Sequence, residues 1–193
     1  NELLAQDFAG EVNLKRYLTH YKQVASMYAE VENSIAVLSD MGSNRSNIYY
    51  GKVGEVLGIA LHGECHLIES IWEEEIFSRI HPDDLVKKHT RELRFLHFLK
   101  NALEKQRNDY YLEEYLRMCD SVGKYHQVLH RMFYVIAQDT GNICLALCLY
   151  NLTEVSSIGS MIGNSADGSR IDIDTYDCSD LLSRREKEIL ILI

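Results

Sequence analysis

Histidine and cysteine side chains lie close together at His62, Cys65 and His66, where their spacing could serve metal binding. Two histidines four residues apart on a helix present their rings on one face, as zinc ligands do. Gly63 weakens a helix at this point, and the sequence offers no fourth ligand apart from distant carboxylates. We therefore interpret these side chains as surface or packing residues and predict no metal site.

Covalent catalysis would need an activated nucleophile, and the sequence shows no pattern that activates one. It contains neither a nucleophile-elbow sequence nor a glycine-rich phosphate loop. The cysteines are odd in number and irregularly spaced, which favours reduced thiols over a disulfide framework: Cys65, Cys119, Cys144, Cys148 and Cys178. We predict that the protein is not an enzyme, and that it has no catalytic residues and no cofactor.

The composition is that of a globular protein with one main core. The chain has 193 residues, of which 46% are hydrophobic and 25% charged. A net charge of −9 argues against binding of nucleic acid by this fragment. No apolar run reaches membrane-spanning length and the start lacks a basic-then-apolar leader, so we expect a cytoplasmic protein without a membrane partner.

A hairpin at residues 128–137 and 143–150 is the strongest element of the predicted fold, with a turn signal containing Gly141 between its strands. In the second strand, alternation predicts Ile143 with the leucines on one face and Cys144 with Cys148 on the other. Neither face is polar. Both faces must therefore be covered by helices, and both cysteines should be buried and reduced.

Further segments complete an α+β fold. His81-Pro-Asp-Asp84 is a helix start, because proline fits the first helical position and the carboxylates complement the helix dipole. That helix should run to about Gln106 and be largely buried, and residues 64–80 should hold one or two helical segments. The remaining predicted strands are residues 34–39, 46–50 and 110–119.

A long amphipathic helix is predicted within residues 1–33. Its apolar residues recur at spacings of three and four, which suits a helix lying on its own sheet and also a dimer seam. The two arrangements are compatible at different ends of the helix, and we expect a homodimer. The apolar row is Leu14, Tyr17, Tyr21, Val24, Tyr28 and Val31.

The order of strands and helices over residues 34–154 resembles the PAS domain family, and Ile80-His-Pro-Asp-Asp-Leu85 resembles the start of the long helix in one PAS subfamily. The resemblance implies a sensory domain with a five-stranded antiparallel sheet and helices inserted between its second and third strands. It also implies a ligand pocket between sheet and helices, although the candidate residues are equally those of a filled core: Tyr49, Trp72, Phe98, Met132 and Tyr134. Haem-binding relatives place an iron ligand on the long helix, where His89 and His97 lie here; we predict no haem.

Residues 155–180 are rich in glycine and serine and predict a linker with a small β-hairpin. Residues 181–193 begin a new helix, in which Ser183 and Glu186 form a capping box. This start resembles the first helix of the LuxR-type helix-turn-helix, whose recognition helix is absent from this fragment. The matching residues are Leu182, Ser183, Arg185, Glu186, Glu188, Ile189 and Leu190.

The sequence thus predicts the sensory and dimerisation region of a LuxR-type transcriptional regulator, which binds DNA through a C-terminal domain missing here. A small-molecule ligand perceived by the PAS-like domain would shift the regulator between two populations of states. The main alternative is a ligand-free PAS scaffold that only dimerises. A metal- or thiol-dependent enzyme is the third class, and it would carry stoichiometric metal on purification.

Overall fold

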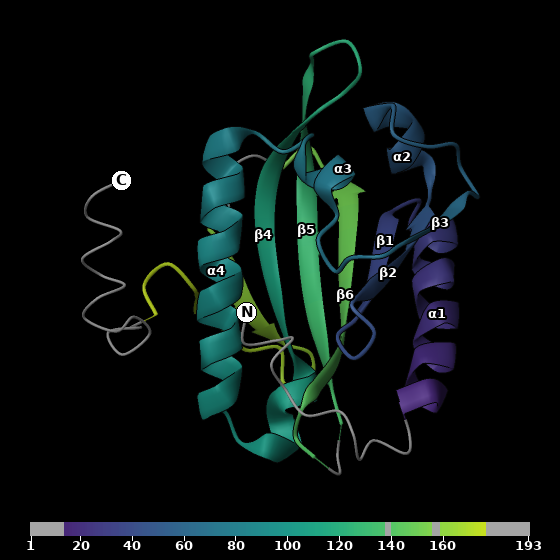
Figure 1. Cartoon of the computed structure of the whole chain (residues 1–193). Helices are drawn as coiled ribbons and strands as arrows, with labels where there is room; N and C mark the ends of the chain where they lie inside the picture. The colour runs from purple at the N-terminus through teal and green to yellow at the C-terminus, as the bar shows by residue number, and fades with distance from the viewer. Residues whose placement is uncertain (1–13, 138–139, 156–158, 177–193) are drawn as a thin grey trace, which may run out of the picture.

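The computed structural model describes residues 14–137, 140–155 and 159–176, which form one antiparallel sheet with helices on both faces (Figure 1). Its eight strands lie in the order β3-β2-β1-β6-β5-β4-β7-β8. Their bounds are β1 Ile35–Asp40, β2 Arg45–Tyr50, β3 Cys65–Ile68, β4 Tyr110–Cys119, β5 Tyr125–Ile136, β6 Ile143–Leu152, β7 Met161–Asn164 and β8 Arg170–Asp172.

The sheet has eight strands where the sequence predicted five. The five central strands, β2-β1-β6-β5-β4, are the predicted ones, and the helices enter the chain between β2 and β4. The prediction was wrong for 65–68, which form β3 at the edge beside β2 instead of helix. Gly63, at φ +86°, turns the chain back onto that edge. The other two strands, β7 and β8, form a hairpin within residues 155–180, where a linker with a small β-hairpin was predicted. This hairpin extends the main sheet, because β7 pairs with β4 through Tyr110–Glu113.

The helices divide between the two faces of the sheet. Helix α4 (Pro82–Asn101) lies on one face with the short helices α2 (Lys52–Leu57) and α3 (Glu74–Phe77), and α1 (Leu14–Val31) packs on the other (Figure 1). Pro82 takes the first turn of α4 as predicted, and the His81 ring accepts a hydrogen bond from the backbone N–H of Asp83 at 3.2 Å. The helix ends at Asn101, before the predicted Gln106, because Ala102 is extended and a 3-10 turn, Glu104–Asp109, follows.

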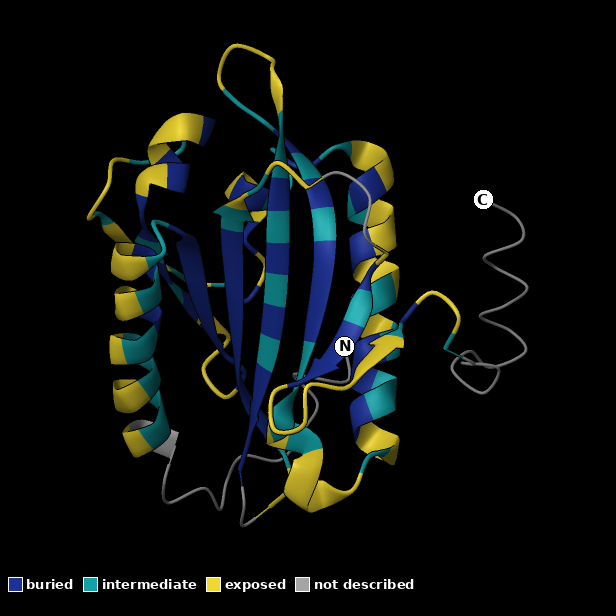
Figure 2. Ribbon diagram, turned by 180° about the vertical axis from the view of Figure 1, so that it is seen from behind, coloured by how far each residue is buried: buried dark blue, intermediate teal, exposed yellow. Residues whose placement is uncertain are grey.

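Two hydrophobic cores result, one on each face, so the central strands are buried on both sides (Figure 2). Strand β6 is buried over its first eight residues. The predicted alternation fails at its start, because a register shift between Val135 and Ile136 makes Cys144 the bulged residue of β6. Cys144 therefore lies in the α1-side core and Ile143 in the α4-side core, the reverse of the predicted faces. Cys144 and Cys148 are both buried as expected, and neither forms a disulfide within the described residues.

Helix α1 packs along the sheet of its own chain. Tyr17, Tyr21, Val24 and Tyr28 are half-buried against the strands, and Ala25 is fully buried in the core between helix and sheet. The C-terminal end of the predicted apolar row does not pack on the sheet, because Val31 is 74% exposed. Met27, one turn earlier in the helix, is 64% exposed. The tyrosines thus serve the monomer core, and the dimer remains a prediction.

Helix α4 is less buried than its apolar sequence suggested. Val86 and Leu93 are exposed, and two charged side chains, Asp84 and Lys88, are buried in their place. The helix lies along the α4-side core with its polar groups partly turned inward. Charged side chains are rarely buried unless they are paired, so this inversion indicates a candidate functional site in the interior beside α4.

Candidate functional site

Lys88 extends from α4 into the protein interior, with only 2% of its side chain exposed. Its ammonium group donates to the carboxylate of Glu92, one helical turn further along. The Nζ atom also lies 4.8 Å from the centre of the Phe77 ring, a cation–π contact with α3. A buried charge is rare unless it is paired, so α4 brings an ion pair to the centre of the site.

The sheet supplies the facing polar groups, Glu114 from β4 and His130 from β5, both without exposed side-chain surface. Their side chains are joined by a hydrogen bond of 2.9 Å between His130 Nδ1 and Glu114 Oε1. The ring of Tyr150 from β6 stacks on the His130 ring at a centroid distance of 4.6 Å. The strand register places these three residues side by side across β6, β5 and β4.

The same row continues through Ile35 on β1 to Tyr50 on β2. Within the described residues, its four polar members each retain a buried atom without a hydrogen-bond partner: Tyr50 Oη, Tyr150 Oη, His130 Nε2 and Glu114 Oε2. We call Tyr50, Tyr150, His130 and Glu114 the polar row. Glu114 Oε2 has an ion-pair contact with Arg91 at 3.5 Å, whereas the other three atoms have no such partner. A buried polar group left unpaired destabilises a protein by about 1–3 kcal/mol, so the row indicates partners that come from outside the chain.

A third carboxylate lies at the start of α3. Glu73 is 5% exposed, and Ser39 on β1 donates to it at 3.4 Å. Ser46 on β2 in turn donates to Ser39 at 2.9 Å. Burial raises the pKa of Glu73 to about 7, against the opposing influence of Lys88. The interior below α4 therefore contains three acidic side chains, Glu73, Glu92 and Glu114, around one lysine.

Burial also sets the protonation of the hydrogen-bonded pair. Desolvation lowers the pKa of His130, and nearby Lys88 lowers it further, so the imidazole is neutral at pH 7. Desolvation raises the pKa of Glu114, opposed by Lys88 and Arg91. For Lys88, burial lowers the pKa but the surrounding acids, Glu92 first, raise it overall. The lysine therefore remains an ammonium ion.

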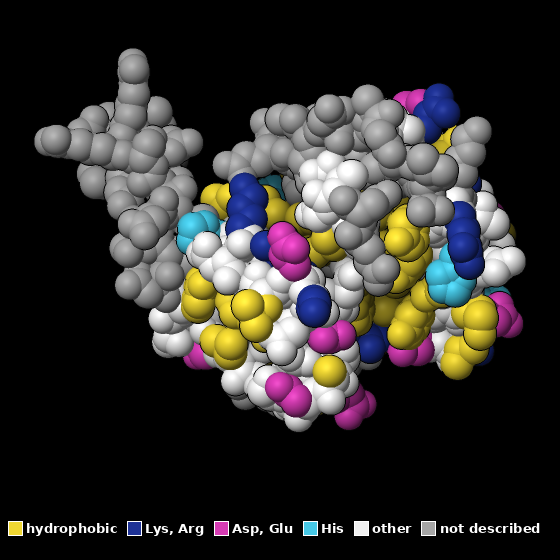
Figure 3. Space-filling model, turned by 90° about the horizontal axis from the view of Figure 1, so that it is seen from below, with side chains coloured by type: hydrophobic (Ala, Val, Ile, Leu, Met, Phe, Trp, Pro, Cys, Tyr) yellow, Lys and Arg dark blue, Asp and Glu magenta, His cyan; other side chains and the backbone are white. Residues whose placement is uncertain are grey.

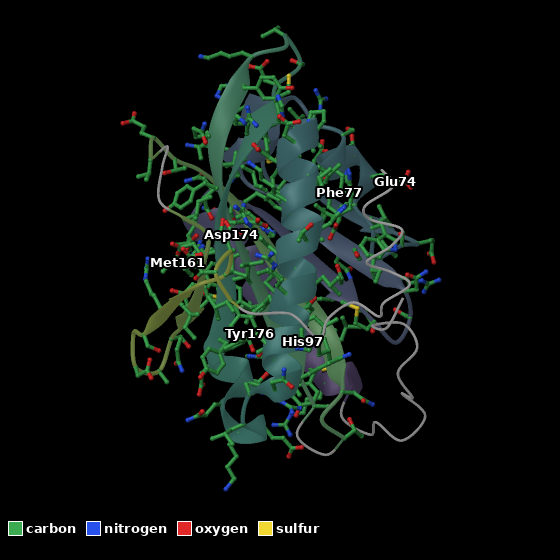
Figure 4. All side chains as sticks on the ribbon, turned by 90° about the vertical axis from the view of Figure 1, so that its left-hand side faces the viewer. Glu74, Phe77, His97, Met161, Asp174 and Tyr176 are labelled. Atoms are coloured by element: carbon green, nitrogen blue, oxygen red, sulfur yellow. The ribbon has the colours of Figure 1, made fainter. Side chains whose placement is uncertain are left out.

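The segment that follows β8 lies beside α4 and is bonded to it (Figure 4). Arg91 donates to both carboxylate oxygens of Asp174, at 2.9 and 2.7 Å, and lies 3.5 Å from Glu114 Oε2. Arg94 donates to the carbonyls of Ile173 and Asp174 at 3.2 and 3.1 Å. The Tyr176 ring meets Phe98 edge-on at 5.4 Å. Residues 173–176 are thus fastened to the same helix that carries Lys88 and Glu92.

A cleft of about 240 Å³ opens at the surface beside this helix. Its arginines are already paired, because Arg117 bonds Asp84 at 2.8 Å and Arg91 bonds Asp174. The compensated charges leave no clear preference for an anion, so we assign no ligand to it. The lining residues are Asp84, Lys87, Arg91, Tyr115, Arg117, Gln127, Gly159 and Ser160.

The five residues predicted to line a pocket do not gather in one place. Met132 and Tyr134 are buried in the α4-side core and Phe98 packs against it. Tyr49 lies on the α1 side of the sheet instead, and Trp72 is 44% exposed at the surface. Tyr49 is separated from the other residues because strand alternation directs Tyr49 and Tyr50 to opposite faces of the sheet.

The other singled-out histidines have separate neighbours. His62 lies 3.8 Å from Glu30 and His66 lies 3.1 Å from Glu64. On α4, His89 contacts the Phe77 ring and His97 bonds Asn101 at 3.1 Å. The buried polar cluster below α4 was not predicted from the sequence, although strand alternation indicated that Glu114 lies on an apolar face. That glutamate is flanked by Leu112 and Leu116, both fully buried on the same side of β4.

Comparison with known proteins adds little to the geometry. No protein-family model and no curated protein matches the sequence. Among solved structures, the chain is similar to the crystal structure of a sensory box histidine kinase/response regulator from Burkholderia thailandensis. The TM-score is 0.37 at 14% identity, over 86% of this chain and 97% of that chain. A TM-score this low carries no argument.

The protein's own topology defines its class. It is an α+β protein whose antiparallel sheet contains the five strands and the helical insertion that the PAS resemblance implied. The matching residues of the LuxR-type resemblance, 182–190, lie outside the described residues. Within the described residues, none of the helices combines the length and the apolar character needed to cross a bilayer.

Proposed function

We propose that this protein is a signal-sensing region in which a small polar ligand binds between α4 and the polar row. The observation that carries the proposal is the set of four buried polar atoms on one face of the sheet that have no hydrogen-bond partner within the described residues. A ligand that bonds these atoms would stabilise one position of α4, because the helix carries Lys88 and Glu92 at the same site. Binding would then act by population shift.

Tyr150→Phe tests this proposal, because the substitution removes an unpartnered hydroxyl and keeps the ring. Without ligand, the variant should be more stable than the wild type by about 1 kcal/mol, since a buried unpaired group is removed. In a thermal-shift screen of small polar metabolites, a compound that raises the wild-type Tm should raise that of the variant less.

The control is Tyr125→Phe, at a tyrosine that is 47% exposed. Loss of its hydroxyl should change neither the stability of the free protein nor the rise in Tm that a compound causes. If Tyr150→Phe destabilises the free protein and no compound raises the wild-type Tm, the hydroxyl has a structural role. The ligand-free scaffold would then be the better account.

We further propose that the sensed state is passed to a LuxR-type DNA-binding domain beginning in residues 181–193. The position of the connecting segment supports this proposal. The chain leaves the sheet through residues 173–176, and Arg91 and Arg94 bond this segment to α4. A shift of α4 would therefore move the start of the connection to residue 181. We also propose that two copies associate, with the exposed end of α1 at Met27 and Val31 in the interface.

The expected output is dimeric DNA binding by a chain extended through the remaining helices of a LuxR-type domain. The 193-residue protein, with net charge −9, should show no sequence-specific shift in a mobility assay at physiological salt. The extended chain should bind paired half-sites, and Met27→Glu with Val31→Glu should weaken that binding by loss of the dimer. Specific binding by the 193-residue protein alone would refute the domain assignment. A hydrophilic control pair, Gln23→Glu with Ser26→Glu, separates loss of apolar contact from added charge.

A further inference from the structure

Helix α1 carries a row of apolar residues on a flank that its own sheet covers only in part. Tyr17, Val24 and Val31 recur every seven residues, and Met27 lies on the same flank. A seven-residue repeat keeps side chains on one line of a helix, as in the contact between two helices. Tyr17 and Val24 are half-buried, whereas Met27 and Val31 are 64% and 74% exposed. We call these four residues the α1 seam.

The two flanks of α1 have different neighbours in the same chain. On one flank, Glu30 lies 3.8 Å from His62, in the loop that precedes the edge strand β3. The α1 seam lies on the opposite flank, which the strand order places toward β5. Leu129 and Phe133 on the same face of β5 are only half-buried. Among the described residues, α1 is the only α-helix on this face of the sheet, so no other helix covers the seam.

The charges of α1 are reversed with respect to its helix dipole. The first half of the helix contains Arg16 and Lys22 and no acidic residue, and the second half contains Glu30 and no basic residue. Figure 3 views the molecule from the end at which α1 begins, and Lys or Arg and His side chains lie together at its right-hand edge, where α1 lies. A helix dipole favours acids at the N-terminus and bases at the C-terminus, so this arrangement is unfavourable within one helix.

The same charges are favourable between two antiparallel copies of α1, because the basic half of one then lies beside the acidic half of the other. When the two helices cross near Val24, Arg16 of each copy approaches Glu30 of the other, and Tyr17 approaches Val31. Arg16 and Glu30 are both exposed and therefore accessible to such a partner. In a parallel pair, like charges would instead face each other. The contact is isologous, as in most homodimers, because each copy offers the same surface.

We propose that the α1 seam binds the seam of a second copy of this chain, with the two helices antiparallel across a two-fold axis near Val24. The inference rests on the dimer of the proposed function and deepens it, because it assigns the orientation of the two sensory domains. It also explains the double use of one helix. The tyrosine-bearing face serves the core of its own chain, and the adjacent flank, with Met27 and Val31, serves the contact between copies.

Charge reversal at the two ends of α1 tests the antiparallel orientation. Arg16→Glu places two glutamates against each other at both ends of the contact, and Glu30→Arg places two arginines there. At low ionic strength, each variant alone should dimerise roughly ten-fold more weakly than the wild type in analytical ultracentrifugation. An equimolar mixture of the two variants should form a heterodimer with wild-type affinity, because opposite charges then meet at both ends. Circular dichroism of both variants checks that the fold survives.

The matched controls are Lys105→Glu and Glu104→Arg, two charge reversals at exposed residues of the 3-10 turn, which should leave dimerisation unchanged. A mixture that dimerises no better than either α1 variant alone would overturn the antiparallel orientation. A dimer that both α1 reversals leave intact would overturn the α1 contact and keep the proposed dimer. A wild-type protein that is monomeric throughout would overturn both. Ligand binding is measured separately, through the effect of Tyr150→Phe on Tm, so the sensory proposal stands or falls independently.

Discussion

Lys88→Ala should lower the free energy of unfolding by roughly 3–5 kcal/mol, the range for loss of one partner of a buried ion pair. Glu92 would keep its carboxylate with no ammonium group beside it, next to Glu73 and Glu114. The aliphatic stem of Lys88 and its contact with Phe77 would also be lost. Urea denaturation followed by circular dichroism measures the change.

The adjacent Lys87→Ala is the matched control, because Lys87 is exposed and should change stability by no more than about 0.5 kcal/mol. The double variant Lys88→Met, Glu92→Leu should recover part of the loss, since an apolar pair of similar volume replaces both charges while Glu73 and Glu114 remain without the lysine. If Lys88→Ala and Lys87→Ala have equal effects, Lys88 is not buried in the way the structure shows.

Gly51→Ala should lower the free energy of unfolding by about 3 kcal/mol or more, although it adds only one carbon atom. A Cβ at this position would lie 2.3 Å from the carbonyl carbon of Asn33 and 2.4 Å from the Ala29 carbonyl oxygen. Both neighbours are backbone, so neither can rotate away. The glycine lets the start of α2 pass directly against the C-terminal end of α1, where its own N–H donates to Ser34 at 2.7 Å.

Thermal and urea unfolding of Gly51→Ala should be compared with those of Gly159→Ala. Among the described residues, a Cβ at residue 159 would meet only Asp172, at 4.0 Å, and we expect it to change stability little. A Gly51→Ala protein as stable as the wild type would mean that α1 does not pack against the 51–53 junction. The docking of α1 on its own sheet would then need revision.

Local physics explains the part of the fold that the sequence predicted. The turn at Gly141 and the proline start of α4 depend on the conformational limits of single residues. Two apolar faces in β6 required helices on both sides of the sheet, and the structure places them there. The bulge at Cys144 was not predictable in the same way, because it depends on the register with β5.

The candidate site was decided by tertiary structure alone. Alternation along β4 determines that Glu114 shares a face with Leu112, but no local rule determines which strand lies beside it. Tyr50, Tyr150, His130 and Glu114 become one row only when β6 is inserted between β1 and β5. The sequence by itself therefore determined the elements and their apolar faces. Non-local strand pairing and the docking of α4 decided which buried polar groups meet, because those contacts join residues far apart in the chain.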